Sequence, residues 1–67
     1  MRDRIFEFIR GYIESNHEAP TIAEIQRRFQ LSSTATVHAH LTALEREGRI
    51  TKTPNVSRGI KIVEVAR

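Results

Sequence analysis

Residues 21–47 read TIAEIQRRFQLSSTATVHAHLTALERE and contain two helical patterns joined by a short connection. The first four residues have the spacing of a capping box, in which threonine and glutamate satisfy free backbone amides, so a helix is predicted over about residues 22–29. Apolar residues at helical spacing predict a second helix over about residues 34–47, with Ser33 as its N-cap and Gly48 as its terminator. The connection between these helices is long enough only for a tight turn, which is typical of a helix-turn-helix.

The flanking segments complete a small domain. Before the helix-turn-helix, apolar residues fall in one sector of a helical wheel and predict a helix over about residues 3–15, and the pattern then breaks before Pro20. After Gly48 the apolar period changes to two, and a Pro-Asn-Val-Ser turn separates two runs, which predicts a β-hairpin over about residues 49–64. The predicted fold is therefore mainly α with a small β-hairpin, a three-helix winged helix-turn-helix that occupies residues 1–67 as a single domain.

Composition narrows the class of function. The chain contains no cysteine, which excludes disulfides, thiolate zinc sites and cysteine nucleophiles. No run approaches the roughly 18 apolar residues of a membrane span, and the charged start lacks the apolar stretch of a signal peptide, so no membrane association is expected. Residues 1–26 carry three basic and five acidic side chains, whereas residues 27–61 carry seven basic and two acidic ones. The second part is therefore expected to face a polyanion.

One side of the helix predicted over residues 34–47 carries small, mostly uncharged side chains opposite its apolar stripe. Such a ridge lets the helix backbone approach base edges in a DNA major groove, which is about 12 Å wide and admits one helix. The alternative is that alanine is simply the best helix former. The small-residue ridge consists of Ala35, Ala39, Thr42, Ala43 and Arg46.

Polar and cationic side chains flank this ridge. Hydroxyl groups near the start of the helix can donate to phosphates or bases, although serine and threonine also cap helices; these groups belong to Ser33, Thr34 and Thr36. His38 points sideways and is a candidate for contact with a base or a phosphate. Arg49, Lys52, Arg58 and Lys61 lie on or beside the hairpin and are candidates for clamping the sugar-phosphate backbone, the alternative being a solvated edge protected by charge.

No metal site, cofactor or catalytic site is predicted. His38 and His40 diverge by about 200° on a helix, and His17 lies in a distant loop, so the three do not converge on a metal ion. His40 borders the apolar stripe and is expected to be a partly buried structural residue. The three glycines form no phosphate-cradling loop, and no spacing recommends a serine and a base as a catalytic pair.

One further expectation is a surface ion pair between Glu24 and Arg28, one helical turn apart.

From about Ile5 to Ile62 the chain resembles the DNA-binding domain of the LexA repressor family, which controls the bacterial DNA-damage (SOS) response. The resemblance rests on four segments in the family's order and spacing. They are Ala19-Pro-Thr-Ile-Ala-Glu-Ile, Ser32-Ser-Thr-Ala-Thr-Val-His-Ala-His-Leu, Leu44-Glu-Arg-Glu-Gly-Arg-Ile and Ser57-Arg-Gly-Ile. Ala35 and Ala39 stand where relatives often carry serine and glycine, which leaves the preferred operator open.

The resemblance implies that the start of the third helix reads bases and that the wing serine and arginine contact the backbone. The base-reading role then falls on Ser33, Ala35, Thr36, His38 and Ala39. With the flanking polar and cationic side chains added, the set expected at the DNA backbone is Ser32, Thr34, Thr42, Arg46, Lys52, Ser57 and Arg58.

Two departures from the family bear on stability and activity. Gln30 replaces a glycine common at the turn, which costs on the order of 1 kcal/mol if the turn needs a left-handed residue. The family's second domain, with its self-cleaving serine-lysine pair and main dimer contacts, has no counterpart in these 67 residues. The chain is therefore not expected to be an enzyme, and it is either an isolated domain or a short relative.

The resulting hypothesis is sequence-specific binding of double-stranded DNA by a repressor domain in the bacterial cytoplasm, at the nucleoid. The expected partner is an operator with palindromic half-sites, and a homodimer on DNA is allowed for. The alternative is a winged-helix protein-interaction module that pairs with or modulates a full-length repressor.

Overall fold

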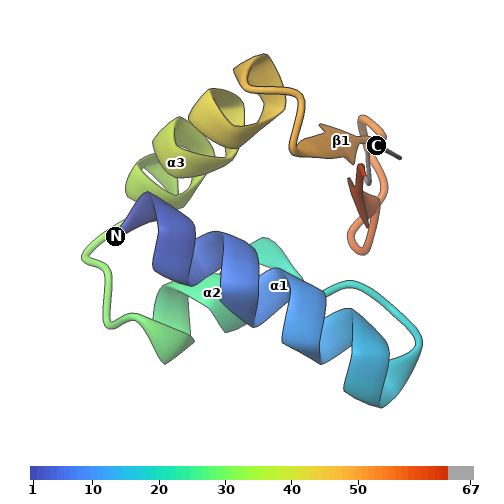
Figure 1. The fold of residues 1–67 in the computed structure, drawn as a ribbon. Helices are drawn as coiled ribbons and strands as arrows, with labels where there is room; N and C mark the ends of the chain where they lie inside the picture. The colour runs from blue at the N-terminus through green and yellow to red at the C-terminus, as the bar shows by residue number, and fades with distance from the viewer. Residues whose placement is uncertain (64–67) are drawn as a thin grey trace.

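The computed structural model describes residues 1–63 and shows three helices followed by a two-stranded antiparallel hairpin (Figure 1). This confirms the predicted three-helix winged helix-turn-helix, and each helix boundary lies within one residue of its predicted place. The predicted end of the hairpin at residue 64 and of the domain at residue 67 lies outside the described residues. The elements are α1 (Arg2–Asn16), α2 (Ile22–Arg28), α3 (Thr34–Arg46), β1 (Ile50–Lys52) and β2 (Ile60–Ile62).

Local signals set the ends of the helices as predicted. The capping box of α2 is complete, because Thr21 N donates to Glu24 Oε1 at 2.8 Å and Glu24 N donates to Thr21 Oγ1 at 3.1 Å. Gln30, in the turn between α2 and α3, has a φ of 54°, so this turn does require a left-handed residue. Gly48 ends α3 with a φ of 75°, a conformation that favours glycine.

The core joins every element of the fold. Its buried side chains are apolar, and partly buried aromatic residues of α1 and of the C-cap of α2 pack around it. The apolar stripe of α3 lies wholly inside this core, as do Ile50 of β1 and Ile60 of β2. One side of α3 is therefore committed to packing. The buried set is Ile5, Ile9, Ala19, Ile25, Val37, Leu41, Leu44, Ile50 and Ile60.

The hairpin ends in a tightly closed tip. Its strands pair with Lys52 opposite Ile60, and beyond that pair Thr53 N donates to Gly59 O at 3.1 Å while Gly59 N donates to Val56 O at 3.2 Å. A Cβ at Gly59 would lie 2.9 Å from Thr53 O, so a larger residue there would push the two sides of the tip apart. We call residues 50–62 the wing.

Two interactions involving arginine tie the helices together. The predicted pair between Glu24 and Arg28 is wrong: the Arg28 guanidinium lies over the ring of Phe8 of α1 at 5.9 Å, and Glu24 binds an arginine of the wing instead. Arg2 of α1 forms an ion pair with Glu47 at 2.9 Å, just beyond α3. Within residues 1–63, no helix has the length and apolar character needed to cross a membrane.

Candidate nucleic-acid interface

The small-residue ridge of α3 faces away from the core. The side chains of Val37, Leu41 and Leu44 are fully buried on one side of the helix. On the opposite side all members of the ridge are exposed except Ala43, which is half-buried. The ridge is thus an exposed surface on a helix whose orientation is fixed by its buried side.

The N-terminal end of α3 carries several hydroxyl groups. Ser33 occupies the predicted N-cap position, but its side chain makes no capping hydrogen bond, and its Oγ lies 3.4 Å from Thr36 Oγ1. Ser32 and Thr34 are exposed and Thr36 is half-buried. Since its hydroxyl is not used to cap the helix, Ser33 keeps donor and acceptor capacity for a ligand.

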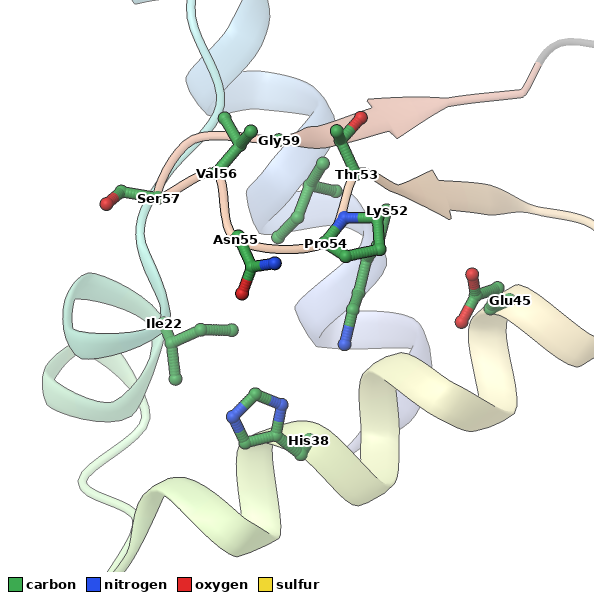
Figure 2. Close-up of a pocket in the computed structure, with 11 residues that line it drawn as sticks. Ile22, His38, Glu45, Lys52, Thr53, Pro54, Asn55, Val56, Ser57 and Gly59 are labelled. Carbon is green, nitrogen blue, oxygen red and sulfur yellow. The ribbon is translucent and has the colours of Figure 1, made fainter.

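A cleft separates α3 from the tip of the wing. It has a volume of about 380 Å³, and its walls come from α2, α3 and the wing. Figure 2 shows the His38 ring, the Lys52 side chain and the Asn55 amide directed into this space from opposite sides. Ser57 also lines this cleft and is exposed. The cleft therefore runs along the side of the ridge and holds groups of both the helix and the wing.

The basic side chains of the second part of the chain divide into two classes. Arg49 donates to Asp3 at 2.7 Å and lies 4.2 Å from the centre of the Phe6 ring, so it is tied to α1. Arg58 is bound by Glu24 of α2 and by the Ala19 carbonyl between α1 and α2. Lys52 and Arg46, in contrast, form no ion pair within residues 1–63. The cations left for a polyanion are thus fewer than the sequence suggests.

Arg58 is the site residue whose placement differs most from expectation. Its guanidinium, expected at a DNA phosphate, donates to Glu24 and to the Ala19 carbonyl, with the hydroxyl of Tyr12 at 3.3 Å. Hydrogen bonds that Glu24 accepts lower its pKa from the ordinary value to about 2. The bond from Arg58 is the largest cause, and the bond from the Thr21 amide is the next. The same carboxylate raises the pKa of Arg58. The phosphate contact of Arg58 stays a prediction, and Glu24 is its competitor.

Sequence reasoning missed two features of this region. The sequence predictions place Glu24 in the capping box and in a local ion pair, and they give Tyr12 no role at this site. No local signal could reveal their contact with Arg58, because 34 and 46 residues separate them from it. His40 is half-buried as expected, and within the described part of the chain no group of three His, Asp or Glu side chains is arranged to hold a metal ion.

Comparison with known proteins gives a consistent picture. A family model described as LexA DNA binding domain matches residues 2–59. The chain is 42% identical over 66 residues to "LexA repressor 2" of Pseudomonas putida, covering 98% of this chain and 33% of that protein. It is 40% identical over 62 residues to the "LexA repressor" of Herpetosiphon aurantiacus, covering 92% of this chain and 29% of that protein. The chain thus spans about a third of the length of these curated relatives.

Proposed function

Because the chain belongs to the LexA DNA-binding domain family, we propose that it binds double-stranded DNA sequence-specifically as the DNA-reading part of a transcriptional repressor. In this proposal α3 enters the major groove of a half-site and the wing contacts the adjacent backbone. Repression follows because the bound domain occludes promoter DNA.

The observation that carries the proposal is the free ridge of α3. A helix that reads bases must approach them closely along one side while its other side is fixed to the domain. The exposed side chains of Ala35 and Ala39 are short enough for that approach, and the buried stripe fixes the helix behind them. We assign base reading to the ridge and the hydroxyl-bearing end of the helix, through Ser33, Ala35, Thr36, His38 and Ala39.

Backbone contacts are proposed on both sides of the ridge. Lys52 supports this assignment best, since its side chain extends into the cleft toward α3 and forms no ion pair within residues 1–63. A DNA strand that passes the cleft brings its phosphates near this ammonium group. The other residues assigned to the backbone are Ser32, Thr34, Thr42, Arg46 and Ser57.

The biological setting follows from the relatives and is part of the proposal. The curated relatives are named LexA repressors, which supports a role in the SOS response in the bacterial cytoplasm. Binding as a homodimer to palindromic half-sites is the arrangement we propose for the whole protein. Self-cleavage is not assigned to these 67 residues, whose matching family model describes a DNA-binding domain.

The direct test is selection from a pool of random-sequence duplexes, followed by titration of the enriched duplex at several salt concentrations. We expect one enriched half-site sequence and an affinity that falls steeply with salt, because phosphate contacts release counterions. Enrichment of no sequence, or a flat salt response, would contradict the proposal. Tight binding to a full-length LexA repressor without binding to any duplex would favour a protein-interaction module instead.

A further inference from the structure

The Arg58 side chain joins three segments of the chain. Its Nη1 donates to Glu24 Oε1 at 2.9 Å and its Nη2 donates to Glu24 Oε2 at 3.3 Å, which forms a two-pronged ion pair with the start of α2. Nη1 also donates to the carbonyl oxygen of Ala19 at 2.9 Å, in the connection between α1 and α2. The wing is thereby attached to the helices at the residue that directly follows its exposed tip, residues 53–57.

Neighbouring groups reinforce this attachment. The Tyr12 hydroxyl accepts from Arg58 and donates to Glu24 Oε2, both at 3.3 Å, so α1 takes part as well. Glu18 adds a longer ion pair to Arg58 at 3.7 Å. Only about a third of each side chain of the central pair is exposed, 35% for Arg58 and 34% for Glu24. The arrangement is more enclosed than an ordinary surface ion pair.

This arrangement opposes a phosphate contact by Arg58. Its two terminal nitrogens already donate to Glu24 and Ala19, so a phosphate must displace a carboxylate that stands in the same place. Lys52 and Asn55 are the wing groups directed into the α3 cleft (Figure 2), whereas Arg58 lines a different cleft together with Glu18 and Ala19. The position of these groups relative to α3 therefore depends on where Arg58 holds the tip.

We infer that Glu24 and Arg58 are positioning residues, which fix the wing tip at the distance from α3 that DNA requires, and that neither acts by contacting DNA. The inference rests on the proposed DNA-binding function. It has a counterintuitive consequence: removing the negative charge of Glu24 weakens binding to a polyanion. A direct phosphate contact by Arg58 has the opposite consequence, because loss of Glu24 would free the guanidinium for DNA.

Glu24→Gln is the informative variant. Glutamine serves as well as glutamate at the third position of a capping box, so the start of α2 is kept while the negative charge that faces Arg58 is lost. Arg58→Lys is its counterpart, because lysine keeps a charge suited to phosphate but lacks the planar fork that binds both carboxylate oxygens. Glu14→Gln, on the exposed face of α1, removes one negative charge elsewhere and serves as the matched control.

The experiment measures the affinity of each variant, and of the double variant Glu24→Gln/Arg58→Ala, for the duplex enriched from the random pool. We expect roughly tenfold weaker binding by Glu24→Gln, Arg58→Ala and Arg58→Lys, with the double variant no weaker than the singles, since the two residues act as one unit. The salt slope of Arg58→Ala is expected to equal that of the wild type. Glu14→Gln is expected to bind as tightly as the wild type or slightly tighter.

Three results would overturn the inference while leaving the DNA-binding function in place. They are equal or tighter binding by Glu24→Gln, full recovery by Arg58→Lys, or a salt slope reduced by about 1 in Arg58→Ala, which is the signature of a lost phosphate contact. A wild-type chain that bound no duplex would refute the proposed function itself. Amide NMR spectra of the Glu24→Gln variant without DNA test whether the pair positions the wing tip. Chemical-shift changes from the wild type that are confined to α2, with none at the wing tip, would contradict that claim.

Discussion

The guanidinium of Arg49 lies 2.7 Å from the carboxylate of Asp3, although 46 residues separate them, so the first turn of α1 is bound to the residue that precedes β1. Arg49 also lies over the Phe6 ring and contacts Glu47 at 3.4 Å. An arginine that packs its guanidinium on an aromatic ring contributes through packing as well as through charge.

We therefore expect Arg49→Ala to lower the melting temperature more than Asp3→Asn does. The first variant loses the ring contact and both carboxylate contacts, whereas the second loses one exposed partner. Thermal unfolding followed by circular dichroism measures both. Equal melting temperatures for the two variants would mean that the contact with Phe6 adds nothing.

The ion pair between Glu24 and Arg58 predicts how stability depends on pH. The folded-state pKa of Glu24 is lowered from 4.5 to about 2, so the pair stabilises the fold fully above pH 4.5 and loses this effect as the pH falls toward 2. The difference in free energy of unfolding between the wild type and Glu24→Gln should be largest near neutral pH and shrink across that window. Urea unfolding at several pH values tests this, and a difference that stays constant from pH 7 to pH 2 would refute it.

The turn between α2 and α3 offers a stabilising substitution. Gln30 has a φ of 54° and an exposed side chain. Its left-handed conformation therefore lowers the free energy of unfolding, and burial of the side chain does not offset this loss. Gln30→Gly is expected to raise the free energy of unfolding by about 0.5 to 1 kcal/mol. Urea or thermal unfolding measures the gain. Gln30→Ala is the control and should give none, because alanine is also strained at this φ.

Base reading by α3 predicts separate effects on specificity and on affinity. Changing Thr36 or His38 to alanine is expected to alter the preference at one base pair by about 1 to 3 kcal/mol. Lys52→Ala is expected to weaken all duplexes alike and to reduce the salt slope by about 1. Titration of the enriched duplex and of its single-base-pair variants separates the two patterns. Uniform losses for all three substitutions would contradict the division between base and backbone residues.

Elements and their ends could be predicted because local chemistry decides them. The Thr21 hydroxyl and the Glu24 carboxylate satisfy amides three residues away, and Gly48 takes up a conformation that follows from its own lack of a side chain. The apolar stripe of α3 identified the buried side of that helix, and so also its free side. The position of the ridge was thus available from the sequence.

The partners of the arginines could not be predicted in the same way. The separation of charge along the chain indicated a basic second part that faces a polyanion. In the folded protein, Arg49 and Arg58 of that part bind Asp3 and Glu24 of the acidic first part. A helical wheel shows which way a side chain points on its own helix, but it carries no information about a wing that packs there from 34 residues away.

Base reading by the α3 ridge is tested most sharply by the affinity of Ala39→Glu for the enriched duplex, compared with that of Gly11→Glu. Both add one negative charge to an exposed helical position, Ala39 on the α3 ridge and Gly11 on α1 with no neighbour near its added Cβ. If the ridge lies in the major groove, Ala39→Glu binds about 100-fold more weakly, because a carboxylate there meets the bases and phosphates, while Gly11→Glu binds nearly as the wild type. Equal affinities for the two variants, with both folded, would show that the ridge does not face DNA.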